Sequence, residues 1–487
     1  MKKNLSVILL MLITINSFAQ SPAFTQTTLV SGLTYPVAFD IAPDGRFFIT
    51  QKGGNSAGSC ANGLIKVHDA NGTFLSNFYD LTDSVQCDFE RGLLGICIDP
   101  NFISNHYVYA YYNHLYAGDE RIRVVKFTEV NNQGTNPTLI LDINVANNIA
   151  GNHVGGNIHM HASEPDKIYV SIGDIAVQAN GQTKTDPYGS FLRIKTDGTI
   201  PTDNPFYDDG NPATGNDDRI WTYGHRNAFD FTFSAVNDSL YSSENGLNTW
   251  DELNMIHKGK NYGWNSCEGF FALGSTSNPC ALSGSELPIE DWASPLPAIT
   301  GILHYSGSAF PTLDNHLLVA DNDYGRIYNI TLGNAPAYDT MLSRTTWADF
   351  TTTGGLTTLK EGVDECVYAM KGGYTTAGAI YRICPLGMDV SPVAQMPEII
   401  SISPNPSQGD FNFHLQLESS TDVELNFYDI SGRLTGTKQV NAVSEGKLIL
   451  QVKTSETGIE KGVIFCNVTI RNKNGTKTAR NIKLIVS

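Results

Sequence analysis

The sequence predicts an all-β protein, a six-bladed β-propeller followed by a small Ig-like β-sandwich. Glycine and proline are plentiful, at 45 and 21 of 487 residues, and segments long enough for amphipathic helices are scarce. A loose repeat also covers residues 30–384. Each copy joins an apolar strand through a turn to a second strand rich in β-branched and aromatic residues.

The repeat has six copies, spaced by roughly 50 to 80 residues. They begin at Val37, Leu93, Asn157, Phe229, Phe310 and Leu356. Turn sequences such as P-D-G, P-D-K and L-D-N separate the two strands of a copy, and such residues favour tight connections. One copy cannot bury both of its faces alone, so the pattern predicts six four-stranded blades around an axis. A β-helix would need shorter and more regular periods.

The pattern changes after residue 385, which divides the chain into a propeller (20–385), a proline-containing linker (386–397) and a second domain (398–487). Apolar and polar residues alternate in the second domain. The alternating runs are F-N-F-H-L-Q-L (411–417), V-E-L-N-F (423–427), L-I-L-Q-V (448–452) and I-K-L-I-V (482–486). Strict alternation indicates strands with one buried face and one wet face, as in a small sandwich.

The first 19 residues have the pattern of a cleavable signal peptide. Lys2 and Lys3 precede an apolar run at 7–15, and Ser17-Phe18-Ala19 supplies the small residues that predict cleavage after Ala19. The run is shorter than the roughly 20 residues that span a membrane, and no later segment is longer. The formal net charge of −17 argues against a nucleic acid or an anionic membrane as partner. We therefore expect an exported protein with no transmembrane segment in its mature form.

Export permits disulfides among the eight cysteines. One predicted pair brackets a polar loop, and another lies on two strand-like runs joined by a turn. The predicted bridges are Cys267–Cys280, Cys366–Cys384 and Cys60–Cys87, and the predicted buried thiols are Cys97 and Cys466.

Several short motifs follow one another in the C-terminal domain. They are S-P-N-P-S-Q-G-D-F (403–411), N-F-Y-D-I-S-G-R-L (426–434), K-G-V-I-F-C-N-V (461–468) and the terminal K-L-I-V-S. In this order they resemble the type A sorting domain of the type IX secretion system. The resemblance implies that the type IX machinery is a partner, and that the domain is removed with release or surface attachment. The other interpretation is an ordinary carbohydrate-binding or adhesive sandwich.

The propeller contains a second ordered set of motifs. It includes E-R-G-L-L-G-I-C-I-D-P-N-F (90–102), N-H-V-G-G-N-I (152–158), K-I-Y-V-S-I-G-D (167–174), G-S-F-L-R-I-K-T-D-G-T-I-P-T-D-N-P-F (189–206), R-I-W-T-Y-G-H-R-N-A-F (219–229), S-S-E-N-G-L-N-T-W-D-E-L-N (242–254) and N-Y-G-W-N-S-C-E-G (261–269). Together they resemble the soluble glucose/sorbosone dehydrogenase family, whose founding members use pyrroloquinoline quinone (PQQ) and calcium. The resemblance covers nearly all of residues 30–384 and implies a secreted oxidoreductase acting on a sugar.

Oxidation of a sugar at C1 to a lactone moves a hydride from C1 to PQQ and a proton from the C1 hydroxyl to a base. Histidine suits that base. The resemblance gives this role to His153, which stands in G-N-H-V-G-G-N-I-H-M (151–160), and a catalytic role to Arg226. Gly155 and Gly156 are then expected to keep the backbone thin beside a planar cofactor.

The resemblance also implies the residues that bind the cofactor and its calcium. The cofactor contacts are Glu90, Asn152, Arg226, Asn227 and Lys360, and the calcium ligands are the main-chain carbonyls of Gly246 and Leu247. PQQ carries three carboxylates and needs cations. The family has a lysine where Asp323 stands here, arginines near Lys360, and an acidic residue at the position of Asn152.

Two other functions fit the same propeller. A divalent metal held by acids at strand ends, with Asn227, could activate water for lactone hydrolysis. The acids in question are Glu90, Asp174, Glu244 and Asp321, and His159 and His161 alternate on one strand where they could share a metal. Alternatively, the protein could be a non-enzymatic module that binds carbohydrate or protein.

Overall fold

The computed structural model describes residues 24–55, 60–116, 118–145, 150–350, 355–386, 399–403, 410–417, 421–428, 433–443, 446–458, 461–472 and 477–486. The predicted signal peptide (1–19) lies outside the described residues, and so does the predicted linker apart from residue 386. Strands dominate the described part of the chain, which confirms the all-β prediction.

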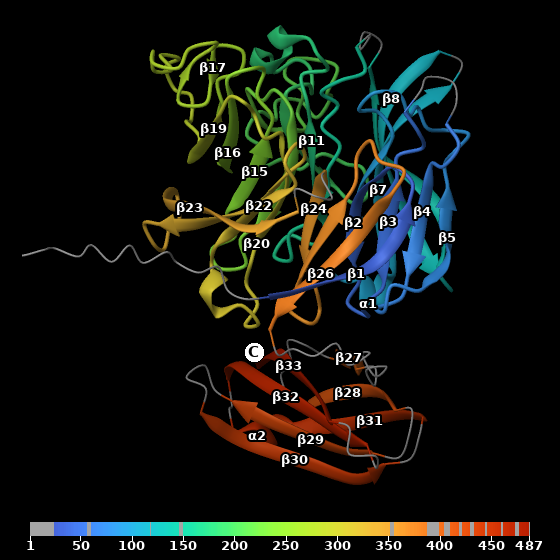
Figure 1. Ribbon diagram of the computed structural model, residues 1–487. Coiled ribbons are helices and arrows are strands. Elements are labelled where there is room, and N and C mark those ends of the chain that lie inside the picture. The colour runs from blue at the N-terminus through green and yellow to red at the C-terminus, as the bar shows by residue number, and fades with distance from the viewer. Residues whose placement is uncertain are drawn as a thin grey trace, which may run out of the picture.

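Six antiparallel four-stranded sheets follow one another along the chain, and we number them as blades 1 to 6 (Figure 1). Blade 1 contains β2 (Pro36–Ile41), β3 (Phe47–Gln51), β4 (Leu64–His68) and β5 (Phe74–Asp80). Blade 2 contains β6 (Leu93–Ile98), β7 (Tyr107–Tyr116), β8 (Asp119–Val130) and β9 (Gln133–Asn144). Blade 3 contains β10 (Ile158–His159), β11 (Lys167–Ile172), β12 (Ser190–Lys195) and β13 (Ile220–Tyr223).

The other three blades repeat this arrangement. Blade 4 contains β14 (Ala228–Phe233), β15 (Leu240–Glu244), β16 (Trp250–Ile256) and β19 (Glu290–Ala293). Blade 5 contains β20 (Ile299–His304), β21 (Leu317–Asp321), β22 (Arg326–Gly333) and β23 (Thr340–Asp349). Blade 6 contains β24 (Leu356–Glu361), β25 (Val367–Lys371), β26 (Gly378–Pro385) and β1 (Phe24–Leu33). Short elements in the connections are α1 (Phe102–Asn105), η1 (Gln178–Gln182), β17 (Cys267–Glu268), β18 (Phe271–Ala272) and η2 (Pro311–Leu313).

The ring closes through its ends. The N-terminal strand β1 pairs with β26, so it supplies the outer strand of the last blade (Figure 1). The first strand of each blade contacts the neighbouring blade: β2 contacts β6, β6 contacts β10, β14 contacts β20, β20 contacts β24, and β24 contacts β2. Between blades 3 and 4 the contact is made by β11 and β14. These contacts complete the predicted six-bladed propeller.

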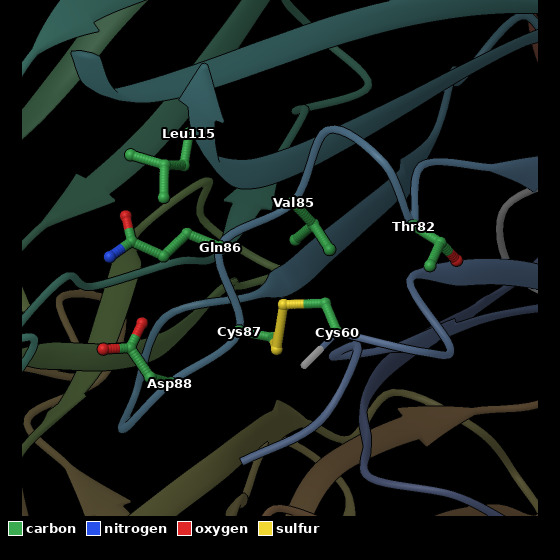
Figure 2. A pocket seen from close by; sticks show the side chains of 7 residues that line it. All are labelled: Cys60, Thr82, Val85, Gln86, Cys87, Asp88 and Leu115. Carbon is green, nitrogen blue, oxygen red and sulfur yellow. A yellow bond between two sulfur atoms is a disulfide. The ribbon is translucent and has the colours of Figure 1, made fainter. Parts of the chain in front are cut away.

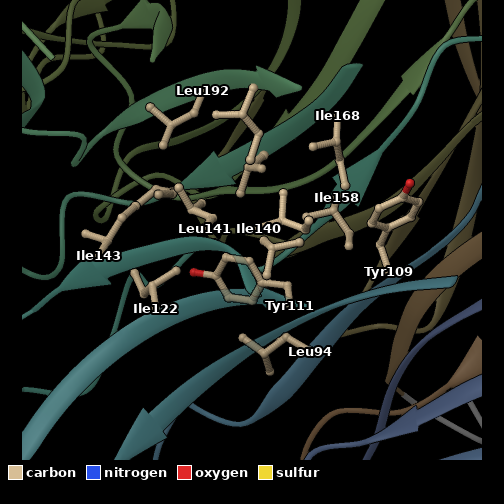
Figure 3. Packing of buried hydrophobic residues seen from close by; sticks show 14 of the residues in the cluster. Leu94, Tyr109, Tyr111, Ile122, Ile140, Leu141, Ile143, Ile158, Ile168 and Leu192 are labelled. Atoms are coloured by element: carbon tan, nitrogen blue, oxygen red, sulfur yellow. The ribbon is translucent and has the colours of Figure 1, made fainter. Parts of the chain in front are cut away.

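Buried apolar residues fill the spaces between neighbouring blades, with one cluster for each of the six pairs. Figure 3 shows the cluster between blades 2 and 3, where Tyr111 and Ile122 pack against Ile158 and Ile168. A sheet with two apolar faces needs a neighbouring sheet on each side to bury both faces. The core therefore favours a closed ring over an isolated blade.

The predicted start of the fifth copy is wrong. Residues 311–313 form η2, which connects β20 to β21, and the first strand of blade 5 is β20. Proline at 311 cannot donate an amide hydrogen to a ladder, so the segment turns where a strand was expected. All six residues of β20 are buried, and such a short apolar run lacks the alternation that marks a half-exposed strand.

All three predicted disulfides are present, with Cα–Cα distances of 5.8 Å for Cys60–Cys87, 5.4 Å for Cys267–Cys280 and 4.9 Å for Cys366–Cys384. The two remaining cysteines, Cys97 and Cys466, are buried free thiols, as predicted. The bridges lie within blades or within their connecting loops, and each constrains a local segment.

The described C-terminal residues form two antiparallel sheets. One contains β27 (Ile399–Ser403), β28 (Asp410–Leu417) and β31 (Gly446–Lys453), and the other contains β29 (Thr421–Tyr428), β30 (Leu434–Val443), β32 (Gly462–Asn472) and β33 (Lys477–Val486); a single helical turn, α2 (Thr454–Thr457), follows β31. Alternate residues of β28 and β29 are buried in one cluster, which agrees with the predicted sandwich. No helix among the described residues has the length and apolar character needed to cross a membrane.

Candidate active site

The loop before β6 carries Glu90, and three contacts hold that loop in place. The Cys60–Cys87 disulfide ties its first part to the β3–β4 connection, beside a pocket that Asp88 and Leu115 also line (Figure 2). The buried Lys52 ammonium donates to the carbonyl oxygens of Cys87, at 2.9 Å, and Phe89. Burial lowers the pKa of Lys52 to about 8, although Asp88 and Glu90 oppose that shift.

His153 stands in the loop before β10, in the left-handed region with φ of 54°. Its amide N–H donates to Glu90 Oε2 at 2.6 Å, and its carbonyl accepts from the Ile175 amide at 3.1 Å. The following glycines serve packing, contrary to the expectation that they leave room for a cofactor. A Cβ at Gly155 would come within 2.4 Å of the Ser171 carbonyl oxygen, and one at Gly156 within 2.6 Å of Leu94 Cδ1.

A buried carboxylate orients the His153 ring. His153 Nδ1 lies 2.6 Å from Asp174 Oδ1, and Asp174 is fully buried after the end of β11. Asp174 Oδ1 also accepts the Ala176 amide, and Oδ2 accepts the Trp264 indole N–H at 2.8 Å. An aspartate held by these donors is an acceptor, so Nδ1 carries a proton, and in the neutral ring Nε2 presents its lone pair. No described residue hydrogen-bonds Nε2, and 15% of the side chain is exposed.

Arg226 is buried before β14 and is only partly satisfied by protein groups. Its amide donates to Glu244 Oε1, and Nη1 donates to the Asn245 carbonyl at 2.9 Å. The guanidinium lies 5.5 Å from the ring of Trp264, and its Nε has no hydrogen-bond partner among the described residues. Burial lowers the pKa of Arg226, and the carboxylates of Asp174 and Glu90 partly oppose this. A buried N–H without a partner is a natural place for an anionic or carbonyl oxygen.

The side chain of Asn227 joins the segments from blades 2, 3 and 4. Its Nδ2 lies 3.5 Å from Glu90 Oε2, its Oδ1 accepts the Gly155 amide at 3.2 Å, and its carbonyl accepts the Asn245 amide at 3.2 Å. The structure therefore brings together Glu90, His153, Arg226, Asn227 and the segment that leads to Gly246.

The carbonyls of Gly246 and Leu247 are available to a cation. The amides of four successive residues, 247 to 250, donate to a single oxygen, Glu268 Oε1, at 2.6 to 3.3 Å. In a trans peptide the C=O points opposite to the N–H, so these two carbonyls point away from Glu268. Among the described residues, no group donates to either carbonyl oxygen. Uncharged oxygen ligands on a fixed loop suit Ca²⁺.

The other two predicted cofactor contacts lie differently. Lys360 is half-buried in β24, where its Nζ lies 3.6 Å from Asp40 and 3.5 Å from His159 Nδ1. Burial opposes its charge, but Asp40 and Asp230 outweigh that effect and raise the pKa of Lys360. Asn152 is half-buried beside His153, and no described residue hydrogen-bonds its side chain. The contacts of Lys360 thus place it with the Asp40 and Asp230 carboxylates, whereas Asn152 adjoins His153.

The acids considered for a hydrolytic metal do not form a cluster in the described part of the chain. The groups of three ligand atoms found within 4.8 Å of one another contain none of Glu90, Asp174, Glu244 and Asp321. Each of the four accepts hydrogen bonds from protein donors; for example, Asp321 accepts from the Tyr328 hydroxyl. His159 and His161 also have separate partners, Asp230 and Asp238.

Four residues that build this site were hard to find from the sequence. Asp174 was a candidate only for a metal, although G-D at the end of a buried strand is also where a carboxylate can meet the next loop. Trp264 and Glu268 belong to the motif N-Y-G-W-N-S-C-E-G, but nothing in the motif indicates which groups they reach. Lys52 follows β3 without any recognisable pattern.

The part of the chain that contains this site matches a known family. Residues 33–381 match the sequence pattern described as Glucose / Sorbosone dehydrogenase, which extends over more than half of the chain. The chain belongs to the Glucose / Sorbosone dehydrogenase family. Membership indicates a sugar dehydrogenase-like oxidoreductase. Residues 401–485 match the secretion system C-terminal sorting domain, which implies export by type IX secretion to the cell surface or beyond.

Three curated relatives share the propeller. An uncharacterized protein of Synechocystis is 29% identical over 310 residues, covering 60% of this chain and 72% of that protein. Quinoprotein glucose dehydrogenase B of Acinetobacter calcoaceticus is 26% identical, covering 52% of this chain and 54% of the relative. Aldose sugar dehydrogenase YliI of Escherichia coli is 24% identical, covering 47% and 62%. The chain therefore spans less than two thirds of the length of the two named dehydrogenases.

Solved structures have the same fold. The apo-form of the soluble aldose sugar dehydrogenase from Escherichia coli aligns with a TM-score of 0.64 at 20% identity, over 74% of this chain and 100% of that one. The PQQ-bound aldose sugar dehydrogenase from Streptomyces coelicolor aligns with a TM-score of 0.56 at 22% identity, over 74% and 99%. At these identities the likeness concerns the propeller fold.

Proposed function

We propose that the protein is an exported, PQQ-dependent aldose dehydrogenase that oxidises the C1 hydroxyl of a sugar to a lactone, with His153 as the base. The observation that carries the proposal is the state of the His153 ring, whose Nδ1 is held by buried Asp174 while Nε2 has no described partner. Family membership supports the reaction class. The names of two relatives, a quinoprotein glucose dehydrogenase and an aldose sugar dehydrogenase, support the cofactor and the substrate.

The chain's own residues would handle the proton. The lone pair of His153 Nε2 accepts the proton of the C1 hydroxyl, which makes the ring an imidazolium. Asp174, 2.6 Å from Nδ1, stabilises that positive charge and prevents the ring from turning over. The Trp264 indole N–H and the Ala176 amide hold Asp174 in turn, so the base is oriented before the sugar binds.

The residues present suit PQQ and calcium. The Arg226 guanidinium has a buried Nε without a described partner, which fits a quinone or carboxylate oxygen, and Lys52 adds a second buried cation near Glu90. Asn227 adds an amide at the same place, and the Gly246 and Leu247 carbonyls would hold the calcium. PQQ, when bound, supplies the acceptor for the C1 hydride. We leave Lys360 out of the proposed site because its contacts are with Asp40 and His159.

The same proposal includes the route of export. A signal peptide cleaved after Ala19 would carry the chain to the periplasm, and the type IX machinery would then recognise the C-terminal domain. The observation that supports the second step is the match over residues 401–485.

The test uses the purified full chain, with PQQ and Ca²⁺ added and dye reduction followed for a panel of aldoses. Absorbance titration measures PQQ binding in parallel. We expect cofactor-dependent turnover in the unaltered protein, PQQ binding but no turnover in His153→Ala, and full turnover in His257→Ala, a matched change at an exposed histidine.

Three results would contradict the proposal. Metal-dependent lactone hydrolysis without PQQ would make the propeller a hydrolase. Tight glycan binding with neither activity would make it a binding module. Equal turnover in His153→Ala and the unaltered protein would remove the base assignment even if dehydrogenase activity were present.

A further inference from the structure

A loop of blade 3 has an unusual local composition. Between β12 and β13, residues 207–218 read Y-D-D-G-N-P-A-T-G-N-D-D, with four aspartates and no lysine or arginine. The loop follows the motif that ends at Phe206 and leads into β13, which continues to Arg226. The proposed dehydrogenase chemistry uses none of its residues.

Three of these aspartates converge. Carboxylate oxygens of Asp208, Asp209 and Asp218 all lie within 4.8 Å of one another. None of the three forms an ion pair with a described lysine, arginine or histidine, since the ion pair of this loop joins Asp217 to Arg219. Three carboxylates at such distances repel one another unless a cation, or a proton shared as between Asp209 and Asp218, lies among them.

Asp218 supplies the observation that points to a ligand. Its side chain is fully buried, unlike those of Asp208 and Asp209, which are exposed. Asp218 Oδ1 accepts the Asp208 amide at 2.5 Å, whereas Oδ2 is buried and has no hydrogen-bond partner in the described part of the chain. A buried carboxylate oxygen without a donor or cation is costly, so it calls for an unseen partner.

The loop backbone closes around the same group. The Asn216 amide and side chain donate to Asp208 Oδ2, at 2.9 and 3.1 Å, and the Thr214 hydroxyl donates to Asp209 Oδ2 at 2.5 Å. A Cβ at Gly215, which has φ of 63°, would come within 2.4 Å of Asp208 Oδ2. The carboxylates are thus fixed near one another, and each still has lone pairs for a cation.

We propose that Asp208, Asp209 and Asp218 form a Ca²⁺ site that stabilises the β12–β13 loop. Hard carboxylate oxygens on a surface loop suit Ca²⁺, which takes 6 to 8 oxygen ligands, and water would complete the shell on the exposed side. The ion neutralises three clustered charges and satisfies Asp218 Oδ2. This site differs from the proposed cofactor calcium, whose ligands are main-chain carbonyls of blade 4.

The experiment counts calcium ions on the full chain after treatment with a chelator, without PQQ or sugar. Calorimetry gives the number and affinity of the sites, and thermal unfolding with and without CaCl2 gives the stabilisation. Asp209→Asn is the main variant, because the exposed side chain can lose its charge without disturbing the core. Asp186→Asn removes an exposed charge elsewhere in blade 3 and is the matched control.

We expect the aspartate site to bind one Ca²⁺ with a dissociation constant of about 10⁻⁴ to 10⁻³ M, as in extracellular calcium modules, in addition to any ion at the Gly246 and Leu247 carbonyls. Asp209→Asn should weaken that site at least tenfold and abolish its thermal shift, whereas Asp186→Asn should retain both. Asp218→Asn should unfold at a higher temperature than the unaltered protein in chelator, because it removes the unpaired buried charge, and should not respond to calcium.

The proposal would be overturned if Asp209→Asn bound as many calcium ions, as tightly, as the unaltered protein. It would also be overturned if Mg²⁺ bound this site more tightly than Ca²⁺. Neither measurement involves PQQ or a sugar, so failure of this site leaves the proposed dehydrogenase untouched, and the reverse is also true.

Discussion

Two histidines in neighbouring segments of blade 3, each paired with an aspartate, have opposite surroundings. His153 donates from Nδ1 to Asp174 at 2.6 Å, and its Nε2 has no described partner. His159 lies six positions later, with Nε2 2.9 Å from Asp230 and Nδ1 3.5 Å from the Lys360 ammonium. Burial, together with Lys360, lowers the pKa of His159. The residue types are the same, but only the first pair leaves a nitrogen to accept a substrate proton.

A third pair makes the same point. His225 donates to Glu244 from Nδ1 at 2.9 Å, its Nε2 lies 3.0 Å from the Thr222 hydroxyl, and the ring is fully buried and stacked on Tyr262. A carboxylate partner therefore does not mark a catalytic histidine. The second ring nitrogen determines whether a histidine can act as a base, because a base needs a lone pair that no protein group already uses.

The largest expected effect follows from removing the free nitrogen. His153→Gln should lower kcat of the proposed reaction by about 10² to 10⁴, the range that general bases contribute, while the temperature of unfolding changes little. Dye reduction and thermal unfolding measure the two quantities. A fall in both, in proportion to the folded fraction, would mean that His153 is structural.

We expect a somewhat smaller loss of kcat when Asp174 no longer orients the His153 ring. Asp174→Asn keeps the size of the side chain but lets its amide donate, so the His153 ring should present the wrong tautomer, and kcat should fall by about 10² to 10³. PQQ affinity, from absorbance titration, should change far less than kcat. Unchanged turnover would show that the orientation of His153 does not depend on Asp174.

A change in the His159–Asp230 pair should lower the stability of the protein instead of its turnover. His159→Gln leaves the buried Asp230 carboxylate with a poorer link to the half-buried Lys360 ammonium, and losing a partner of a buried charge costs on the order of 3 kcal/mol. Denaturant unfolding measures this cost, and turnover per folded molecule should stay within about twofold of the unaltered protein. If turnover fell instead while stability held, the contrast between the two pairs would fail.

The smallest effect concerns a buried histidine with no carboxylate contact. His304 in β20 lies 3.4 Å from the Ser234 hydroxyl, its Nδ1 has no described partner, and burial lowers its pKa to about 4. Between pH 6.5 and 4 the unfolded chain binds a proton that the folded chain does not, so the free energy of unfolding should fall as the pH drops through this window. His304→Gln should reduce the loss of unfolding free energy between pH 6.5 and pH 4 by about 2 to 3 kcal/mol, measured by urea unfolding.

The matched control for this change is His257→Gln, because His257 is exposed. It should leave the slope of stability against pH as it is. An identical slope in His304→Gln and His257→Gln would show that His304 binds its proton in the folded protein as readily as in the unfolded one.

The blades could be predicted from the sequence because each repeat contains an apolar strand followed by a turn. This pattern is local, so it can be recognised without knowing which blades pack together. It could not reveal that β1 closes blade 6, because the partner strand β26 lies at the other end of the propeller sequence. It could not find β20 either, since a strand buried on both faces shows no alternation. All three disulfides were found because the cysteines bracket short local segments.

The same limit applies to the site. His153, Arg226, Asn227 and Glu90 were identified because they stand within ordered motifs, and they share one hydrogen-bonded group. Asp174 was not identified as the partner of His153. The two side chains are 21 positions apart, and their pairing depends on where the His153 loop meets the end of β11. Lys360 was predicted to contact the cofactor, but it contacts Asp40 and His159. Its position in the sequence does not reveal which residues of neighbouring blades its side chain meets.

The free nitrogen of His153 can be measured directly. Diethyl pyrocarbonate acylates a neutral imidazole nitrogen that reagent can reach, and mass spectrometry of peptides from the native protein locates the products. We expect His153 to react at least tenfold faster than His159 and His225, with activity lost in step with the His153 product. Reaction of His159 or His225 at the rate of His153, or full activity after His153 is modified, would contradict the central claim that His153 alone of the three keeps a nitrogen for the substrate.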